Sequence, residues 1–475
     1  MRRDHDGRRG RPSRVSDAPQ RLGLSESFGR GARPVPARGG CCGTGAVAGD
    51  RVGEPASKRG ILADGLGRAA PRIAGKDRRV KVVHAIAFAG RRSYGLGAVA
   101  GNIVAEQRRA GIDASVWCLD TDTEGADALR DYGLEPAAMR RFKATGPRSL
   151  GFSLDMERAA RAADAAVIDV FHEHGIWTGV SHVVSSWSRR HRHPTVIAPH
   201  GAMAPWALRR SAWKKRLARW GYENANFSGA ACFHATSALE YRDFREYGLR
   251  CPVACIPNGV KDEWLASTGD GARFRAKYGI EPGRRILLFM GRLTPVKNLV
   301  RLVEAWAATG TTARDWVLVL AGAPEFGYEV QLDERIRQLG LGDAVRAVGG
   351  IHGQDKRDGF AAAECFVLPS LSEGFGMVLL EAIATGIPAI ATTGASWEIL
   401  PKEDCGWWVA PDADGLAGAL AAVFASPPER LAGMGRKARA LAERDFAWRN
   451  VCRQTGSLYE WLRHGGTVPP FVKLD

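Results

Sequence analysis

Short apolar runs alternate with longer amphipathic stretches along most of this chain, and the alternation occurs twice. In the first series the apolar runs cover residues 79–89, 115–120, 165–174, 194–200, 232–237 and 253–260. In the second series they cover residues 284–291, 316–322, 363–370 and 387–393. Strand-length runs with helical stretches between them predict parallel sheets whose crossover helices cover both faces. The sequence therefore predicts an α/β protein with two doubly wound, Rossmann-like domains that face each other across a cleft.

Composition divides the chain into four predicted segments. Residues 1–78 are rich in Gly, Arg and Pro, and residues 1–79 carry ten of the sixteen net positive charges. This segment cannot bury enough apolar surface to offset its chain entropy, so we predict a disordered basic extension. Residues 79–266 and 267–440 are the two predicted domains. Residues 441–475 form a last amphipathic stretch, which we predict to pack back on the first domain.

The charge, the cysteines and the hydropathy limit the possible partners. Because most of the excess charge lies in the extension, we expect no nucleic-acid partner. The nine cysteines show neither paired CxxC motifs nor a regular spacing, which fits a reducing cytoplasm. No apolar run reaches 18 residues, so we expect no spanning helix. The expected location is the cytoplasm, in solution or on the inner face of the membrane.

The stretch SEGFGMVLLE places Glu373 and Glu381 on either side of Gly374, Phe375 and Gly376. The glycines permit a tight turn after the preceding strand, and the apolar run that follows has helical spacing. A helix start offers N–H groups and the positive end of the helix dipole to a phosphate. A carboxylate close to it would accept hydrogen bonds from a vicinal diol such as a ribose. The alternative is an ordinary helix, with Glu373 as a partner of its N-terminal dipole and Glu381 as a solvated residue.

The stretch GRLTPVKN places Arg292 and Lys297 between a predicted strand and a predicted helix. Two cations at this position can clamp a diphosphate and stabilise the negative charge on a departing one. The alternative is that both cations are simply solvated. Because both motifs follow strands of the same predicted domain, they favour a shared anion-binding site.

Together, GRLTPVKN and SEGFGMVLLE closely resemble the motifs of glycosyltransferase family 4, the retaining nucleotide-sugar enzymes of the two-domain GT-B fold. The resemblance extends over about residues 80–465 and includes AECFVLPS and CGWWVA. It implies that Arg292 and Lys297 bind the donor diphosphate, that Glu381 binds the ribose and that Glu373 binds the transferred sugar. The stretch TTGASWEIL departs from the family's paired glycine before proline and glutamate, so Glu398 is a weaker candidate ligand.

The resemblance also covers two loops of the first half. AGRRSYGLGAVAGN resembles the family's glycine-rich first loop, which implies that Gly95 and Gly97 face the diphosphate. Arg91 and Arg92 could meet an anionic acceptor, although a simple strand-to-helix turn would also explain the glycines. His200, in APHGAMAPWAL, matches a histidine that lies beside the donor sugar and its phosphate in the family. The predicted catalytic set is therefore His200, Arg292, Lys297 and Glu373.

The stretch HEHGIW contains a possible metal motif. Alternating strand residues point to opposite faces, so His172 and His174 share a face that Glu173 does not. Because no third ligand lies nearby in the sequence, we predict acceptor-side lining or a structural role, and no metal.

An apolar stripe with a basic rim follows PWAL on a helical wheel. Its members are Trp206, Trp213, Leu217 and Trp220, with Arg209, Arg210 and Arg216 at the rim. Such a helix could bind an anionic membrane surface, where a lipid-linked acceptor would be found. The alternative is that the tryptophans face the core.

The predicted activity is the transfer of a sugar from a nucleoside diphosphate donor to an acceptor hydroxyl, with retention of configuration. The resemblance implies attack on the front face, and it suggests a glycan or lipid-linked acceptor in bacterial surface-polysaccharide assembly. No DxD-like motif accompanies the two cations, so we expect no cofactor and no metal dependence. The alternatives are a sugar-nucleotide epimerase of the same architecture and a non-catalytic nucleotide-sugar-binding protein.

Overall fold

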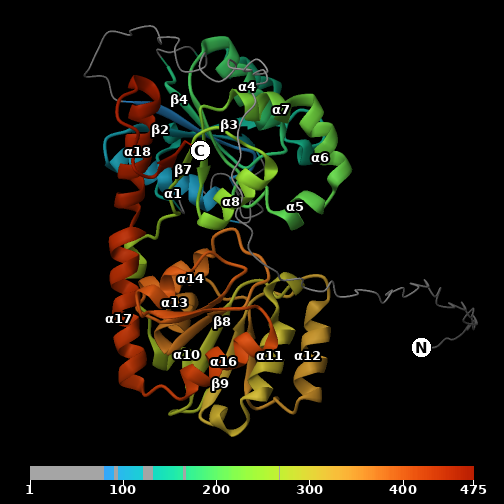
Figure 1. The fold of residues 1–475 in the computed structure, drawn as a ribbon, viewed down its shortest axis with the longest axis vertical. Coiled ribbons are helices and arrows are strands. Elements are labelled where there is room, and N and C mark those ends of the chain that lie inside the picture. Colours follow the sequence, from blue (N-terminus) through green and yellow to red (C-terminus); the bar gives the residue numbers. More distant parts are fainter. Residues whose placement is uncertain (1–79, 90–94, 121–131, 164–166, 267, 475) are drawn as a thin grey trace, which may run out of the picture. The chain divides into compact units, whose positions relative to one another are not determined.

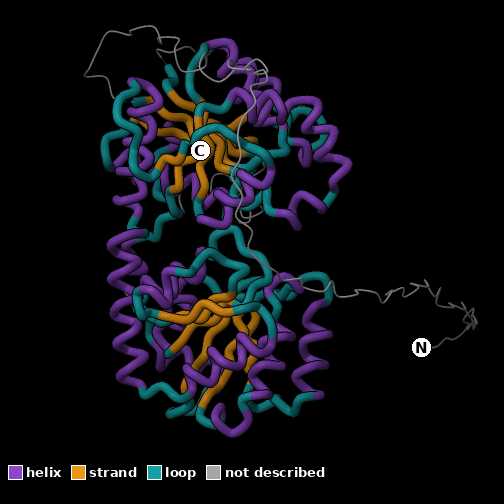
Figure 2. Tube along the Cα trace, viewed as in Figure 1, coloured by secondary structure: helices purple, strands orange, loops and turns teal. Residues whose placement is uncertain are grey.

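The computed structural model describes residues 80–89, 95–120, 132–163, 167–266 and 268–474. The predicted extension, and with it the prediction of disorder, lies outside these ranges. The described chain forms two halves, each built on its own sheet (Figure 1). Helices surround the strands of both sheets (Figure 2), which is why the strands read as continuous apolar runs in the sequence. The predicted α/β class is confirmed.

The first half holds an eight-stranded sheet in the order β14-β7-β6-β5-β4-β1-β2-β3. The strands are β1 (Lys81–Ile86), β2 (Asp113–Asp120), β3 (Met139–Lys143), β4 (Val170–His174), β5 (Thr195–Ala198), β6 (Cys232–Ala235), β7 (Val253–Cys255) and β14 (Val472–Lys473). All pairs are parallel except β14 with β7. The order reverses at β1, which lies between β4 and β2, and parallel α/β sheets bind ligands beyond the carboxyl ends of such strands.

The helices of the first half connect these strands. They are α1 (Leu96–Arg109), α3 (Leu154–Ala162), α4 (Gly179–His191), α5 (Pro205–Arg209), α6 (Ala212–Ala218), a π-helix η4 (Arg219–Glu223), α7 (Asn224–Gly229) and α8 (Ala238–Tyr247). Local sequence sets several of their ends. Ser237 caps α8 by accepting from the backbone N–H of Glu240, and Gly248 ends this helix at a φ of 97°.

The second half holds a six-stranded sheet in the order β10-β9-β8-β11-β12-β13. The strands are β8 (Arg285–Met290), β9 (Trp316–Ala321), β10 (Val345–Gly349), β11 (Cys365–Leu368), β12 (Ala389–Thr392) and β13 (Gly406–Val409). The main helices are α11 (Leu299–Ala308), α12 (Tyr328–Gln338), α13 (Gly353–Ala362), α14 (Met377–Ala384), α15 (Ile399–Lys402), α16 (Ala413–Phe424) and α17 (Pro428–Asp445). Each predicted strand of this half is present.

The stretch between the two sheets is more ordered than its polar sequence indicates. Residues 262–283 contain α9 (Asp262–Leu265) and α10 (Gly271–Tyr278) rather than a simple connection. Asp270 caps α10, and Phe274 is fully buried against the second half. A single buried aromatic residue thus anchors a helix that is otherwise polar.

The C-terminal helix α18 (Trp448–His464), which lies within residues 441–475, packs against α1. The polypeptide returns from the second half to the first just before α18. At this point the Val260 backbone N–H donates to the Phe446 carbonyl at 2.7 Å. Trp448 lies directly on Gly259, where a Cβ would be 2.3 Å from the indole. The predicted boundary after residue 440 falls inside α17, which continues unbroken to Asp445.

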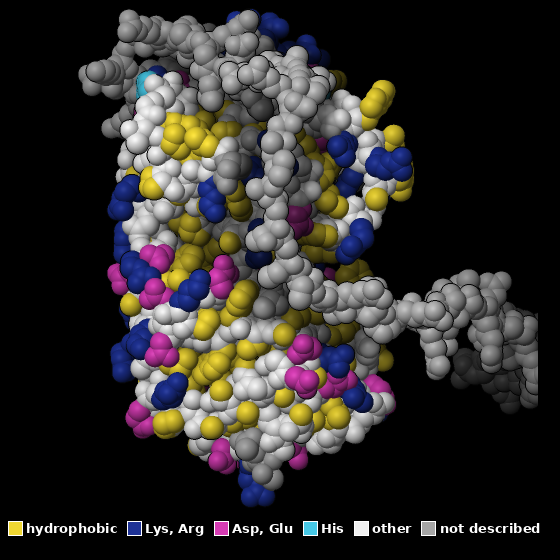
Figure 3. Space-filling view, viewed as in Figure 1, with side chains coloured by type: hydrophobic (Ala, Val, Ile, Leu, Met, Phe, Trp, Pro, Cys, Tyr) yellow, Lys and Arg dark blue, Asp and Glu magenta, His cyan; other side chains and the backbone are white. Residues whose placement is uncertain are grey.

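The tryptophan-rich segment differs from the single helix that the wheel assumed. The helix is interrupted between α5 and α6 at Ser211, whose φ is 52°, so Trp206 lies on a different helix from Trp213. The alternative that the tryptophans face the core is wrong: Trp213 is 63% exposed and Trp220 is 87% exposed. Apolar and basic side chains lie together at the outer edge of the first half, where α6 lies (Figure 3).

Candidate active site

Three loops at the carboxyl ends of β8, β11 and β12 are hydrogen-bonded to one another. The Leu371 N–H donates to the Val296 carbonyl at 2.8 Å, and the Glu373 N–H donates to the Gly394 carbonyl at 2.8 Å. The Thr392 hydroxyl donates to the Ser370 carbonyl at 2.5 Å. These bonds bring the GRLTPVKN and SEGFGMVLLE motifs onto one connected edge of the second sheet.

The cations and carboxylates of these motifs form ion pairs. Lys297 Nζ lies 2.7 Å and 3.0 Å from the two carboxylate oxygens of Glu373. Arg292 Nη1 lies 2.8 Å from a carboxylate oxygen of Glu325, at the more exposed rim. The structure thus brings Lys297 and Glu373 into direct contact, with both side chains less than one fifth exposed. This Lys–carboxylate pair places charge of both signs at the carboxyl edge of the second sheet.

The turn before α14 is built around Gly376. Its φ of 87° favours glycine, and a Cβ there would approach Leu368 at 3.0 Å and the indole of Trp397 at 3.2 Å. The Trp397 indole N–H donates to the Phe375 carbonyl at 2.8 Å, and the Phe375 ring packs against Trp397. Among the described residues no side chain caps α14, so its first turn presents N–H groups for an anion.

Glu381 lies in the second turn of α14 and pairs with a residue that the sequence did not indicate. Its carboxylate is 2.5 Å from Lys356 Nζ of α13, whose ammonium also lies over the Trp264 ring. Lys356 stands in a generally polar helix, GQDKRDGFAA, and carries no motif signal. A ligand that uses Glu381 must therefore exchange or share this ion pair.

Three buried polar atoms near these loops have no hydrogen-bond partner among the described residues. They are the hydroxyl oxygens of Thr294 and Ser370 and one carboxylate oxygen of Glu398. Each follows the carboxyl end of a different strand, β8, β11 and β12 respectively. Unpaired buried polar atoms are rare and often mark a site that a ligand or water completes. Glu398 therefore remains part of this edge in spite of its unusual sequence context.

In the first half, the predicted loop glycines lie at the start of α1. Gly95 has a φ of 95° and precedes the helix, and Gly97 is buried in its first turn. Leu96 lies against the loop after β4, where a Cβ on Gly175 would be 3.1 Å from it. Arg91 and Arg92 fall outside the described residues.

His200 begins a turn beyond the carboxyl end of β5. Its φ of 52° and the φ of 80° at Gly201 are both left-handed. The buried Glu240 carboxylate holds this turn by accepting from the Gly201 N–H at 2.7 Å, and burial raises its pKa. A carboxylate that the sequence did not single out thus fixes the His200 backbone.

The His200 turn meets the glutamate motif of the second half. A Cβ on Gly201 would lie 3.4 Å from the Gly374 Cα, and one on Gly374 would lie 3.7 Å from the His200 carbonyl. Beside it, the Leu239 N–H donates to the Ser396 hydroxyl at 3.0 Å. Ser396, which with Ala395 replaces the family's paired glycine in TTGASWEIL, therefore links the two halves.

The HEHGIW histidines share a face, as predicted, but they do not line a surface. His172 and His174 stack with a ring separation of 4.4 Å, and both are buried. Glu173 points to the other face, where burial and the neighbouring Glu223 raise its pKa to about 8. The Ser181 hydroxyl contacts both carboxylates, at 2.6 Å and 2.8 Å. The prediction of acceptor-side lining is wrong for these histidines, and a structural role remains.

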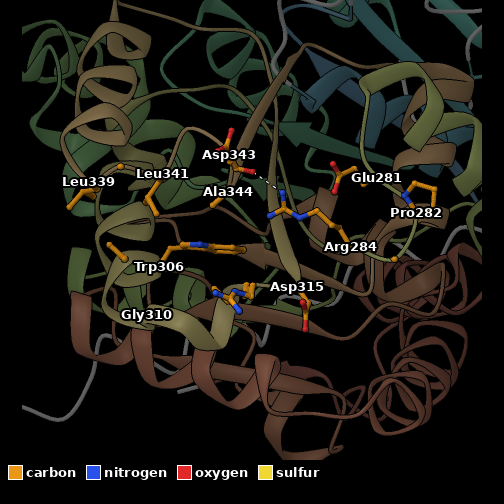
Figure 4. Close-up of a pocket in the computed structure, with 15 residues that line it drawn as sticks. Glu281, Pro282, Arg284, Trp306, Gly310, Asp315, Leu339, Leu341, Asp343 and Ala344 are labelled. Atoms are coloured by element: carbon orange, nitrogen blue, oxygen red, sulfur yellow. Dashed lines mark hydrogen bonds between the residues drawn. The ribbon is translucent and has the colours of Figure 1, made fainter.

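A surface pocket of about 720 Å³ lies elsewhere in the second half (Figure 4). Arg284, Asp315 and Ala344 line it, and each immediately precedes one of the parallel strands β8, β9 and β10. The amino ends of parallel strands lie at the opposite edge from their carboxyl ends. This pocket is therefore separate from the candidate site, and none of the predicted site residues lines it.

Two parallel-sheet halves whose carboxyl-end loops meet define a GT-B type architecture. Two family models match the chain: "Glycosyl transferase 4-like domain" over residues 94–259 and "Glycosyl transferases group 1" over residues 270–441. The chain therefore belongs to the GT-B glycosyltransferases of the family 4-like group.

Curated relatives agree with this assignment. The lipopolysaccharide core biosynthesis mannosyltransferase LpsB of Rhizobium meliloti is 29% identical over 220 residues, which are 45% of this chain and 62% of that protein. An uncharacterized glycosyltransferase of Methanocaldococcus jannaschii is 29% identical, over 44% of this chain and 54% of that protein. The match thus spans less than two thirds of either relative. An alpha-maltose-1-phosphate synthase of Mycolicibacterium smegmatis is 27% identical, over 77% of this chain and 95% of that protein.

Solved structures share the fold. HepE of Anabaena, in complex with UDP and glucose, has a TM-score of 0.64 and 20% identity, covering 80% of this chain and 99% of that chain. The sucrose-phosphate synthase of Thermosynechococcus elongatus has a TM-score of 0.62 and 21% identity, covering 81% and 99%. At these identities the likeness shows the fold alone.

Proposed function

We propose that this glycosyltransferase moves a sugar from a nucleoside diphosphate donor to an acceptor hydroxyl with retention of configuration. The observation that carries the proposal is the contact of the His200 turn with Gly374, next to the Lys297–Glu373 pair. This contact joins a turn that carries a histidine to a turn that carries a carboxylate paired with a cation and leads into an open helix start. Such a set can hold a phosphate and a sugar together.

The donor would lie along the carboxyl edge of the second sheet. The first turn of α14 and Lys297 supply positive charge for the diphosphate, and Arg292 adds charge at the rim. Glu381 lies farther along α14, where its carboxylate would accept from the ribose hydroxyls. The complex of the structurally similar HepE with UDP and glucose supports this class of donor.

The transfer we propose proceeds on the front face of the sugar. The bond from the anomeric carbon to the diphosphate oxygen breaks, and the acceptor oxygen bonds to that carbon on the same face. The acceptor proton passes to an oxygen of the departing diphosphate. Lys297 and the α14 helix start stabilise the charge that develops on this leaving group. We propose that the transfer needs no metal ion, so a chelator would leave the rate unchanged.

We propose a glycan or lipid-linked saccharide as the acceptor, in surface-polysaccharide assembly at the cytoplasmic face of a membrane. The similarity to a lipopolysaccharide core mannosyltransferase supports this class. The exposed Trp213, Leu217 and Trp220, with the basic residues Lys214 and Arg216 among them, favour contact with anionic lipid. No described helix is long and apolar enough to cross a bilayer.

Vesicle sedimentation tests the membrane contact. Wild-type protein should bind vesicles that contain anionic lipid, and the double change Trp213→Ser and Trp220→Ser should weaken this binding at least tenfold. The matched control is Trp316→Phe, which alters a buried tryptophan of the second sheet. Equal binding by wild type and the double variant, or no wild-type binding at moderate salt, would contradict the proposal.

Thermal stability against UDP, GDP, ADP and their common sugar conjugates tests the donor site. Ligands that bind the native state raise its melting temperature. One nucleotide series should stabilise the wild type, and Glu381→Ala should lose that response. Glu364→Ala is the control, because it breaks an ion pair with Arg285 at the amino end of β11. If no nucleotide binds, the donor proposal is wrong; if a sugar nucleotide is converted without any acceptor, the enzyme is an epimerase.

A further inference from the structure

A buried chain of side chains runs from α1 to the candidate active site. Gln107 Oε1 lies 2.8 Å from His84 Nε2, and His84 Nδ1 lies 2.8 Å from His174 Nε2. His174 Nδ1 in turn lies 2.9 Å from His200 Nε2. The first three side chains are at most 2% exposed, and only His200 reaches the site edge.

A second buried branch meets the first at α18. His234 Nε2 lies 2.7 Å from the Ile256 carbonyl, and His234 Nδ1 lies 3.1 Å from His172 Nε2. His172 Nδ1 lies 2.7 Å from the Tyr459 hydroxyl. Burial lowers the pKa of His84 and His234 to about 4 and lowers the pKa of His172, so these imidazoles are neutral at neutral pH.

The orientation of the Gln107 amide is fixed from outside the histidines. The Thr455 hydroxyl donates its one proton to the Cys452 carbonyl at 3.2 Å, so it can only accept from Gln107. Gln107 Nε2 therefore faces Thr455, at 3.1 Å, and also lies 3.4 Å from the Tyr459 oxygen. Gln107 Oε1 is left to accept from His84.

This end point sets every tautomer along the first branch. A neutral imidazole has one donor and one acceptor nitrogen. Since Gln107 Oε1 only accepts, His84 carries its proton on Nε2 and accepts at Nδ1 from His174 Nε2–H. His174 then accepts at Nδ1 from His200 Nε2–H. His200 is left with Nδ1 as an acceptor that bonds no described protein group.

We propose that His84 and His174 are positioning residues that hold His200 as its Nε2–H tautomer, so that Nδ1 accepts a hydrogen bond from a hydroxyl of the donor sugar. This rests on the proposed function, because it assumes a sugar beside the His200 turn. The hydrogen-bonded side chains also connect the His200 turn to α18, since Gln107 contacts two hydroxyls of that helix. An inverted tautomer would present a donor where the sugar hydroxyl requires an acceptor.

The same histidines could in principle bind a metal ion. One ligand nitrogen each from His84, His172 and His174 lies within 4.8 Å of the others. In the hydrogen-bonded arrangement, however, every nitrogen of these three rings already has a partner at 2.7–3.1 Å. Because protein groups satisfy all of these ring nitrogens, the hydrogen-bonded arrangement is favoured over a metal site. Metal content is therefore part of the test.

Two substitutions of one residue separate positioning from packing. His174→Asn places an amide oxygen close to the former Nδ1 and can still accept from His200. His174→Gln places its amide near the former Nε2 and loses that contact. We expect kcat/KM of His174→Gln to fall about tenfold, the loss of about one hydrogen bond, and that of His174→Asn to fall clearly less. Equal losses would indicate packing alone and overturn the proposal.

Nitrogen-15 NMR of labelled histidines reads the tautomer without any activity. The His200 signal is identified by its loss in His200→Asn, and it should show Nε2–H in the wild type and a mixture of tautomers in His174→Gln. A wild-type Nδ1–H tautomer, or one bound metal ion per chain that His174→Gln removes, would overturn the proposal. If the tautomer is as expected but the wild type transfers no sugar, the proposed function fails and the positioning chain stands.

Discussion

Acidification from pH 7 to pH 5 should destabilise this protein through its buried histidines. Burial holds the pKa of His84 and of His234 at about 4, against 6.5 in the unfolded chain. Between these values the unfolded chain binds more protons, so the stability is present above pH 6.5 and is lost as the pH falls toward 4. At pH 5 each histidine lies about 1.5 units below its unfolded pKa, which corresponds to about 2 kcal/mol. The two together cost about 4 kcal/mol, and burial shifts the pKa of His174 in the same direction.

Glu173 opposes this loss. Its pKa is raised to about 8, by burial first and by Glu223 second, so the folded chain binds the extra proton between pH 4.5 and 8. Acidification from pH 7 to pH 5 therefore stabilises the fold by about 2 kcal/mol through this group. Burial also raises the pKa of Glu223, Glu240 and Asp243, and these carboxyls oppose the loss in the same way. Because burial lowers the pKa of six histidines, His84, His172, His174, His193, His200 and His234, against these four carboxyls, the net change should be a loss of stability.

Urea unfolding at pH 7 and pH 5, at constant ionic strength, measures the balance. The wild type should lose a few kcal/mol, which is a large part of an ordinary folding free energy. Glu173→Gln removes one of the opposing groups and should lose about 2 kcal/mol more than the wild type over the same interval. A wild-type stability that is unchanged or higher at pH 5 would refute the assignment of neutral, buried histidines.

Three further changes test the site and the fold. Lys297→Ala should lower kcat/KM by about 10²- to 10³-fold, the usual cost of removing one group that stabilises transition-state charge, whereas Arg301→Ala, which alters an exposed side chain of α11, should not. Gly376→Ala should lower the free energy of unfolding by about 1–3 kcal/mol in urea, because alanine is strained at a φ of 87°. Trp448→Ala should cost about 3–5 kcal/mol, because it empties the contact between α18 and Gly259; a loss below 1 kcal/mol would show that this packing matters little.

The fold could be predicted because its signals are local. The apolar runs at 284–291 and 363–370 correspond to β8 and β11. A strand that is buried on both faces needs apolar residues at nearly every position, so its sequence is easy to identify. The motif residues were also placed correctly with respect to the strands, since a loop must follow each strand end. The contact of Lys297 with Glu373 was not predicted, although both residues were, because 76 residues separate them.

The residues that sequence reasoning missed act through distant partners. His84 lies 90 residues from His174, and Lys356 lies in a polar helix that resembles any solvent-exposed one. The break at Ser211 was missed for a different reason. The helical wheel assumed one continuous helix. In the structure Ser211 adopts the left-handed conformation and interrupts the helix, although no glycine or proline stands at that position. Spacing within one segment carries no information on either kind of feature.

The ion pair between Lys297 and Glu373 indicates the order in which the parts of a donor would bind. Glu373 is held by Lys297, so its carboxylate can accept fully from a sugar hydroxyl only after another anion has taken the lysine. A donor diphosphate is that anion, and its binding would release Glu373 for the sugar attached to it. The site thereby favours a ligand that carries both groups over a free sugar.

Glu373→Gln separates the effect of Glu373 on diphosphate binding from its effect on the sugar. The amide cannot pair ionically with Lys297, so a nucleoside diphosphate without sugar should bind about fivefold more tightly, the equivalent of about 1 kcal/mol for a partly exposed pair. The sugar loses its carboxylate, so transfer should slow. Calorimetry with the nucleotide found in the thermal panel measures the affinity, with Glu364→Gln as the matched control. Weaker binding of the diphosphate by Glu373→Gln would mean that Glu373 orients Lys297 toward the phosphate instead of competing for it.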